Sequence, residues 1–514
     1  MTRDFRCLSP HPAGEQPGIV EAPPSGVDVD SFRGTVRVEW DHDAAMTPLG
    51  QLPFFIDYLK TAGSFDAFVA DCPLRYGSPN APKKRDVLGT AMLAMLAGAK
   101  RYAHVAAVRG DGVLPELLGM GKVVSEDAVR RAFKMIDEAE GAAWLGGHLA
   151  FCVEPLLAEP WILDVDTTIK PLYGHQEGAV LGYNPKKPGR PSHCYHTYSM
   201  ASTRLVLDVD VSSGDEHTSR HSAPGLWAFL DRLPRDLWPA LLRGDSGFGN
   251  EGVMREAEAR GLAYLFKLRL TRNVRRMIEK LSGREWINAG QGFWAKESAV
   301  RLQGWSRERR AIVLRRRLKG AVGLSYSDEN GAEQLTFAEI GKATDLYEYS
   351  VLVTSLDEDT ETFGQLYRDR GDDENIFDEM KNQWGWGGFT THDLARCRLA
   401  ARMLALFYNW WTIFVRLADP NRHREAITSR PLFLSAIATR TRHARQTTIR
   451  VTSSHAKARP AARALAAVAV FLRSLMQSAE QLTRMQKWRA ILSRAFRTFL
   501  NGRPIRPPPR IAPC

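Results

Sequence analysis

The chain of 514 residues contains few cysteines and no long apolar segment. Its six cysteines are scattered without a C-x-x-C pair, which argues against a disulfide framework and the common zinc patterns and suits a reducing cytoplasm. The longest apolar run, residues 464–472, covers about nine residues, whereas a membrane-spanning helix needs roughly twenty. The N-terminal residues carry no apolar signal core. We therefore expect a cytoplasmic protein that does not cross a membrane.

Motifs for several kinds of catalysis are also missing. The sequence has no G-x-x-x-x-G-K-[ST] loop, so nucleotide hydrolysis is not expected. It has no G-x-S-x-G motif and no cysteine in a setting typical of a nucleophile. A chain of this length does not favour a single compact core, and we expect about two to four domains.

Positive charge is present in excess but is unevenly distributed. The net charge is +12. From Asn421 to the C-terminus there are about nineteen Lys and Arg residues against two acids, so the rest of the chain is slightly acidic. Such a surplus favours a polyanionic partner, either nucleic acid or an anionic membrane surface.

Four polar side chains have a spacing that would place them on one face of a helix: Tyr367, Arg370, Glu374 and Lys381. At about 100° per residue they fall within roughly a 60° arc. A carboxylate among cations suits a site that holds a metal ion and grips the phosphates around it. Gly371 interrupts the pattern, so the helix is expected to bend or to begin again there.

Two further carboxylate motifs lie upstream. The segment Trp161–Asp166 is predicted to be a strand, on which Asp164 and Asp166 point to the same side. Asp245 follows another short predicted strand, in a turn that its neighbouring glycines allow. Two weaker candidates, Asp208 and Asp210, are better explained as the solvent-facing side of a strand.

These motifs resemble a known family. Tyr367-x2-Arg370-x3-Glu374-x6-Lys381 matches the Tyr-Arg-Glu-Lys signature of bacterial insertion-sequence transposases with an Asp-Asp-Glu active site. Asp166, followed by two threonines, resembles the first carboxylate motif of that family, which favours Asp166 over Asp164. The segment around Asp245, Arg-Gly-Asp-Ser-Gly-Phe, resembles the second.

The resemblance implies roles for six residues. The catalytic and metal-binding residues would be Asp166, Asp245 and Glu374. The residues in contact with DNA at the ends of the element would be Tyr367, Arg370 and Lys381. Because carboxylate oxygens suit a hard cation, the expected cofactor is Mg²⁺, for which Mn²⁺ could substitute.

The order of predicted elements, β-β-β-α-β-α-β, is that of an α/β fold with a ribonuclease H-like mixed sheet and helices. We expect a β-rich insertion within this core and helical regions on both sides of it. The expected parts are a disordered lead-in (1–35), a helical N-terminal domain that binds DNA or supports the core (36–151), the catalytic core (155–268 and 350–418), the insertion (269–349) and a basic helical C-terminal region with a flexible tail (419–514). In the last part, a stripe of apolar residues beginning at Leu465 could pack within the chain or form a partner interface.

The expected function is transposition of DNA. It would comprise metal-dependent cleavage at the terminal inverted repeats of the element and strand transfer into target DNA, with double-stranded DNA as partner and a homodimer in the DNA complex. We expect the protein to be associated with the nucleoid. Two alternatives stay open: a ribonuclease H-like nuclease without strand transfer, and a DNA-binding protein that has lost catalysis. A glycosidase with paired carboxylates is remote.

Overall fold

The computed structural model describes residues 26–41, 44–184, 187–216, 218–281, 285–317, 326–327, 333–334, 337–338 and 346–505. Contacts between residues divide the chain into two units, Met1–Ala45 and Met46–Cys514. In the first unit, β1 (Val27–Ser31) and β2 (Gly34–Val38) form an exposed antiparallel hairpin. This differs from the unstructured lead-in expected through residue 35, because valines alternate along both strands and Gly34 supplies the positive φ of 109° at the turn. The rest of that lead-in, residues 1–25, lies outside the described residues.

Helices form the first part of the second unit, as the sequence predicts. After β3 (Met46–Thr47) come α1 (Leu52–Ala62), α2 (Ser64–Ala70), α3 (Lys84–Leu96), η1 (Tyr102–Val108), α4 (Leu114–Leu117), α5 (Glu126–Lys134), α6 (Glu138–Val153) and η2 (Glu154–Leu156). The hydroxyl of Ser125 accepts a hydrogen bond from the amide of Ala128 and so caps the start of α5. The residues of α3 from Asp86 onward are buried, which makes this helix the centre of the N-terminal helical part.

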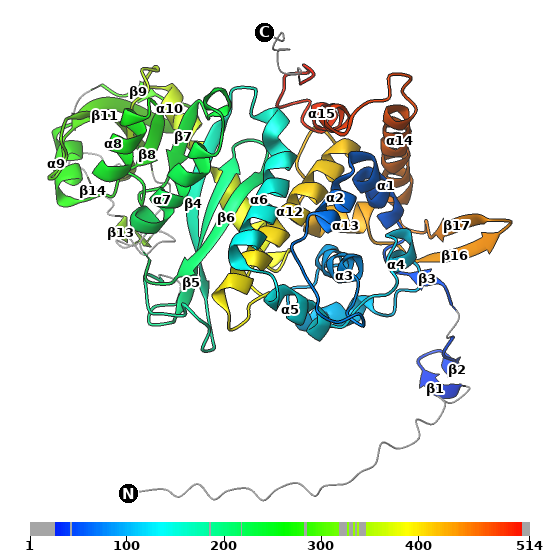
Figure 1. Cartoon of the computed structure of the whole chain (residues 1–514). Coiled ribbons are helices and arrows are strands. Elements are labelled where there is room, and N and C mark those ends of the chain that lie inside the picture. The colour runs from blue at the N-terminus through cyan, green and yellow to red at the C-terminus, as the bar shows by residue number, and fades with distance from the viewer. Residues whose placement is uncertain are drawn as a thin grey trace, which may run out of the picture. The chain divides into compact units, whose positions relative to one another are not determined.

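The central sheet begins with the five strands that the ribonuclease H-like prediction requires. They are β4 (Ile162–Pro171), β5 (Ser192–Met200), β6 (Leu205–Ser213), β7 (Leu241–Gly244) and β8 (Tyr264–Lys267). Their order across the sheet is β6-β5-β4-β7-β8 (Figure 1). β5 is antiparallel to both of its neighbours, β4 and β6, whereas β7 runs parallel to β4 and β8 parallel to β7. The predicted fold class is therefore confirmed.

The β-rich segment after β8 continues this sheet. After α9 (Arg272–Lys280) come β9 (Ile287–Asn288), β10 (Phe293–Val300), β11 (Arg309–Arg317), three two-residue strands β12 (Tyr326–Ser327), β13 (Glu333–Gln334) and β14 (Phe337–Ala338), and β15 (Leu346–Thr354). The sheet continues past β8 in the order β15-β11-β10-β9. The sequence suggested an inserted subdomain, but edge pairing with β8 makes most of these strands part of one sheet, because an unpaired β8 would leave a row of amides and carbonyls without partners.

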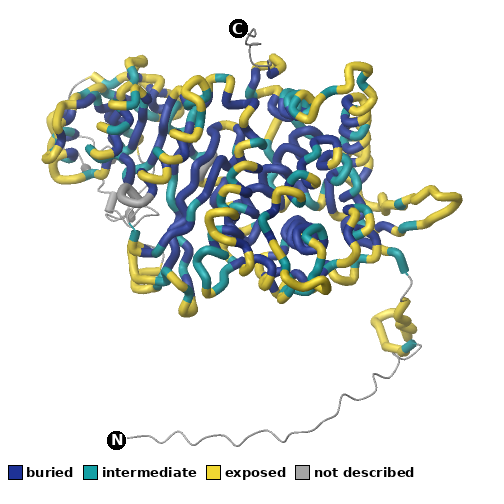
Figure 2. Tube along the Cα trace, viewed as in Figure 1, coloured by how far each residue is buried: buried dark blue, intermediate teal, exposed yellow. Residues whose placement is uncertain are grey.

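Helices cover the sheet on either side of this row of strands. α7 (Thr218–Asp231), η3 (Arg235–Leu237) and α8 (Glu251–Ala259) connect β6, β7 and β8. The long α12 (Leu394–Ala418) packs against β6 and α6 and is buried along most of its length (Figure 2). The side-chain amide of Asn409 holds it in place, because it donates to the carbonyl of Val206 at 2.7 Å and accepts from the amide of Val206 at 2.9 Å. The aromatic residues Phe407, Tyr408, Trp410 and Trp411 of this helix are buried in the core.

The basic C-terminal region is only partly helical. It contains α13 (Ala426–Phe433), α14 (Ala458–Met476) and α15 (Arg484–Ala495), but also a hairpin of β16 (Ala438–His443) and β17 (Gln446–Val451) that the sequence analysis missed. The apolar stripe of α14 that begins at Leu465 is buried within the chain, where the helix packs against α1, α12 and α13. Among the described helices none is both long and apolar enough to span a bilayer.

Candidate active site

The first predicted strand, β4, carries two aspartates with different partners. Asp164 is fully buried and accepts two hydrogen bonds from Arg243 of β7, from Nε at 2.7 Å and from Nη2 at 2.6 Å. Asp166 is partly exposed; its Oδ1 accepts from the amide of Thr167 at 2.7 Å, and its Oδ2 pairs with Arg370. Asp164 is thus committed to a buried ion pair that holds two strands together, which agrees with the preference for Asp166 as the candidate ligand.

Asp245 lies beside Asp166 because of the strand register. Asp164 pairs with Arg243 and Val165 with Gly244 across the parallel strands. The next position on each strand is therefore Asp166 on β4 and Asp245 just beyond the end of β7. Neighbouring strands lie about 4.8 Å apart, so the two carboxylates emerge close together.

The turn after β7 directs Asp245. Its Oδ1 accepts a hydrogen bond from the amide of Gly247 at 2.9 Å, and its carbonyl accepts from the amide of Phe248 at 3.1 Å. Phe248 folds back over Gly244, where a Cβ would lie 3.0 Å from the phenyl ring. A larger residue at position 244 would force this turn apart and would move the carboxylate.

Glu374 comes from a helix on the same side of the sheet. The helical segment consists of α10 (Thr362–Arg368) and α11 (Gly371–Asn382), so the helix begins again at Gly371, one of the two outcomes expected there. Glu374 lies in the first turns of α11 and is exposed. Tyr367 and Arg370 precede α11, and the four residues of the signature therefore do not share one unbroken helix.

The charges of Asp245 and Glu374 both act on Asp166. Burial raises the pKa of Asp166 most strongly, the positive charge of Arg370 opposes this, and the negative charges of Asp245 and Glu374 raise it further; the result is a pKa of about 7. Each of these charges acts on Asp166 only because it lies nearby. The tertiary structure therefore brings these three carboxylates near one another, although each is at least 79 residues from the next along the chain.

The three predicted DNA-contacting residues lie near the carboxylates or near β4 and have partners within the protein. Arg370 is buried and pairs with Asp166. Lys381, near the end of α11, donates to the hydroxyl of Thr168 and, at 3.4 Å, to the carbonyl of Ile169. Burial raises the pKa of Tyr367 to about 12, against the influence of Arg370. These contacts fasten α11 to β4, and the DNA-binding role of the three residues stays a prediction.

The donor set suits a divalent cation, but the arrangement is not a complete cage. Carboxylate oxygens are the ligands that hard cations such as Mg²⁺ prefer. Among the residues that the structure describes, no group of three or more His, Cys, Asp or Glu side chains is arranged to hold a metal ion. Arg370 accounts for part of this, because its guanidinium contacts the Oδ2 atom of Asp166. The chemistry of the residues fits a metal, with Asp166, Asp245 and Glu374 as the groups that would hold it.

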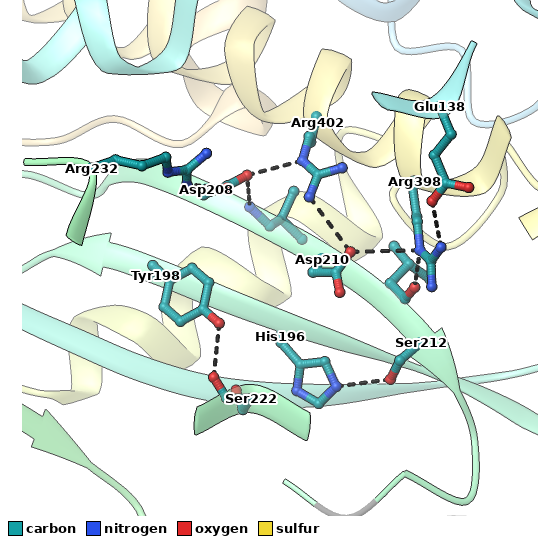
Figure 3. A network of polar contacts seen from close by, with 12 residues as sticks. Glu138, His196, Tyr198, Asp208, Asp210, Ser212, Ser222, Arg232, Arg398 and Arg402 are labelled. Atoms are coloured by element: carbon teal, nitrogen blue, oxygen red, sulfur yellow. Dashed lines mark hydrogen bonds and ion pairs between the residues drawn. The ribbon is translucent and has the colours of Figure 1, made fainter. Parts of the chain in front are cut away.

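The weaker candidates belong to a different part of the molecule. Asp208 and Asp210 lie on β6 and form a network of ion pairs with α12 (Figure 3). Arg402 pairs with Asp208 at 3.0 Å and with Asp210 at 3.5 Å, and Arg398 pairs with Asp210 at 3.6 Å. The expectation of a solvent-facing strand side is wrong for Asp208, which is 8% exposed, because α12 covers that face and supplies the neutralising arginines.

The role of Arg243 as the partner of Asp164 was not predicted from the sequence. It is 1% exposed, and besides Asp164 it also donates to the carbonyl of Leu366 at the end of α10. A signal was present in the sequence: Asp164-x-Asp166 and Arg243-x-Asp245 have the same spacing. If the two strands are parallel neighbours and the carboxylates meet, this spacing must also place Asp164 opposite Arg243.

Comparisons with known proteins identify the family of the chain. Residues 78–473 match the model of a family described as "Transposase DDE domain group 1". No curated protein matches the chain. Among solved structures, the chain is similar to the piggyBac transposase in a cryo-EM synaptic complex with hairpin DNA, with a TM-score of 0.38 and 10% identity over 87% of this chain and 85% of that chain. A likeness of this size is too weak to carry a conclusion.

Proposed function

This chain belongs to the family of transposase DDE domains of group 1 and is a DNA transposase; from this premise we propose that it is a bacterial insertion-sequence enzyme of the Tyr-Arg-Glu-Lys type. It cleaves DNA at the terminal inverted repeats of its own element and joins the freed ends to target DNA. Enzymes of this family use divalent metal ions, and we propose Mg²⁺ as the ion here, with Mn²⁺ able to replace it. The protein would work in the cytoplasm, at the nucleoid, as a homodimer on DNA.

One observation carries the assignment of the site. Asp166 and Asp245 occupy equivalent positions on adjacent parallel strands, and Glu374 lies near enough to raise the pKa of Asp166. Three acids brought together from distant parts of a chain are unfavourable unless a cation compensates them. This arrangement therefore supports a metal-dependent phosphoryl transfer at these residues.

Each residue of the candidate site would have its own role in transposition. Asp166, Asp245 and Glu374 would hold the metal, which, when bound, activates an attacking oxygen and stabilises the leaving oxygen. Arg370, which pairs with Asp166, and Lys381, which contacts β4 at Thr168, would hold DNA phosphates, with Arg370 able to do so through two hydrogen bonds. Tyr367, in the last turn of α10, would hydrogen-bond the DNA backbone or stack on a base.

The test is cleavage and joining of a plasmid-borne element with its native ends. Wild-type protein with Mg²⁺ would be compared with Glu374→Gln, which removes one carboxylate charge without changing shape. Asp378→Asn is the matched control, because Asp378 is an exposed acid one turn further along the same helix, where it pairs with Asn382. We expect excision and insertion by wild type and by the control, and neither reaction by Glu374→Gln or with a chelator.

Other outcomes select other functions. Cleavage without joined products would indicate a nuclease of the same fold. Binding to the ends without cleavage by wild type would indicate a protein that has lost catalysis. Unchanged excision by Glu374→Gln would remove this residue from the site.

A further inference from the structure

The hairpin of β16 and β17 takes no part in the site described above. Its strands pair along six positions. At its base, Ala438 and Thr439 pair with β3, so that the hairpin and β3 form a small sheet separate from the central one. Beyond the base the two-stranded ribbon extends away from the neighbouring helices (Figure 1), and most of its residues are exposed (Figure 2). An isolated ribbon of this kind gains little stability from its own contacts, so a role in binding would explain why it extends from the protein.

The two faces of the ribbon differ in chemistry. Residues directly opposite each other on paired strands point to the same side, so the register assigns each residue to a face. The outer face consists of six exposed side chains that can hydrogen-bond: Thr439, Thr441, His443, Gln446, Thr448 and Arg450. The inner face consists of Ala438, Arg440, Arg442, Thr447, Ile449 and Val451, and it contains all the buried and half-buried residues of the ribbon.

The inner face is fastened to the helical part of the unit. Arg440 and Arg442 both pair with the carboxylate of Glu116, which belongs to α4. Two arginines on one side of the ribbon thus fix its direction relative to α4. The outer face, on the opposite side, is left to the solvent.

At the tip of the ribbon, Arg445 has a backbone conformation that normally favours glycine. Ala444 has a φ of 47° and Arg445 a φ of 67°. Two successive residues with positive φ in a two-residue loop form a type I′ turn, which Asn-Gly would form without strain. Strained backbone that persists at an exposed position is a reason to look for a function, and here it presents Arg445 at the end of the ribbon.

We propose that the outer face of this ribbon contacts duplex DNA, with Arg445 and Arg450 at phosphates and the threonine and glutamine side chains directed into the major groove. A two-stranded β-ribbon fits that groove. Short hydroxyl and amide side chains and arginines are the groups that contact phosphates, sugars and base edges. Between Glu425 and Glu480 the sequence contains no acidic residue that would repel DNA. The inference rests on the proposed function, which supplies the DNA.

Charge favours DNA over a second copy of the chain as the occupant. β17 is an outer strand of its sheet, so in principle it could pair with the same strand of another molecule. That pairing would bring two ribbons together that carry arginines and no acidic residue, so it would be opposed by repulsion between like charges. Phosphates attract the same side chains.

The test is a binding measurement on the full-length protein by fluorescence anisotropy. One labelled duplex carries the end of the element, another of the same length has an unrelated sequence, and each is titrated over a series of salt concentrations. The slope of log affinity against log salt is negative, and each lost phosphate contact should make it less steep by about one. Each lost contact should also weaken the affinity about fivefold near physiological salt. Arg445→Gln with Arg450→Gln should thus weaken binding roughly 25-fold, whereas the paired Lys substitutions should keep most of the affinity.

A matched pair of neutral substitutions separates the two faces. Thr447 and Thr448 are adjacent and both exposed, but they lie on the inner and outer face, respectively. We expect weaker binding for Thr448→Ala and wild-type binding for Thr447→Ala. Equal thermal unfolding midpoints for both variants would show that the fold is unchanged.

The possible results are distinguishable. If the double Gln variant binds like wild type while wild type excises the element, the ribbon proposal is overturned and the transposase function stands. If wild type neither binds nor cuts DNA, both are overturned. A change in oligomeric state with unchanged DNA binding would overturn the proposal in favour of a protein contact. A loss confined to the end duplex would assign the ribbon to the element ends, and an equal loss on both duplexes would assign it to DNA of any sequence, including the target.

Discussion

Two aspartates on one strand should respond in opposite ways to the same substitution. Asp164 and Asp166 are two positions apart on β4, and each pairs with an arginine, Arg243 or Arg370. The side chains of the Asp164–Arg243 pair are 0% and 1% exposed, whereas that of Asp166 is 14% exposed. We predict that Asp164→Asn lowers the free energy of unfolding, and that Asp166→Asn leaves the fold intact but abolishes DNA cleavage.

The magnitudes follow from these environments. Asn at position 164 leaves the guanidinium of Arg243 buried without a balancing charge, which costs about 3–5 kcal/mol, or a factor of roughly 10² to 10⁴ in the unfolding equilibrium. At position 166 burial already opposes the charged carboxylate, and the charges of Asp245 and Glu374 add to this. A neutral amide relieves that repulsion while it loses the pair with Arg370. The free energy of unfolding should therefore stay within about 1 kcal/mol of wild type.

Urea unfolding, followed by tryptophan fluorescence, would measure the stability, and cleavage of a plasmid with the element ends would measure the activity. The double substitution Asp164→Leu with Arg243→Met removes both buried charges and should recover most of the lost stability. The reasoning is refuted if Asp164→Asn is as stable as wild type but inactive. It is equally refuted if Asp166→Asn loses several kcal/mol.

Two further substitutions test an acid-sensitive ion pair and a tight turn. Burial alone would raise the pKa of Glu258, but hydrogen bonds from Arg309 and two other side chains lower it to about 2. A depressed folded pKa stabilises the protein above the ordinary value of 4.5, and this is lost as the pH falls toward 2, so Glu258→Gln should flatten the acid side of a curve of stability against pH; an unchanged curve would contradict this. A Cβ at Gly388 would lie 1.7 Å from the carbonyl oxygen of Lys100, whereas one at Gly387 would meet nothing within 4 Å. In chemical unfolding, Gly388→Ala should lose about 1–3 kcal/mol and Gly387→Ala less than about 1 kcal/mol, and equal losses would show that the turn can adjust.

The core of the fold was predictable because local patterns and catalytic spacing agreed. The first strand was predicted at Trp161–Asp166, which overlaps β4, and the order of strands and helices indicated the ribonuclease H-like sheet. Gly371 correctly marked where the helix begins again. Asp166, Asp245 and Glu374 could be selected because each belongs to a motif whose residue types and spacing are unusual.

Other elements were missed because their local sequence is ambiguous. The ribbon of β16 and β17 is rich in Thr and Arg, so its two-residue alternation is hidden by the lack of an apolar face. The strand pattern after β8 was visible, but its attachment to the core sheet depends on which edge is free to pair. Asp208 looked solvent-facing because α12, nearly 200 residues later, supplies the helix that covers it.

Most of the core strands and helices, and the residue types that could perform phosphoryl transfer, can be read from the sequence, because periodicity and motif spacing are local properties. The tertiary structure alone decided the partner of each charge. Asp164 and Asp166 have the same side chain on the same strand, yet one meets Arg243 in the core and the other meets Arg370 beside two more carboxylates. Which role each takes depends on strand register and burial, because a charge is stabilised or opposed by neighbours that are distant in the sequence.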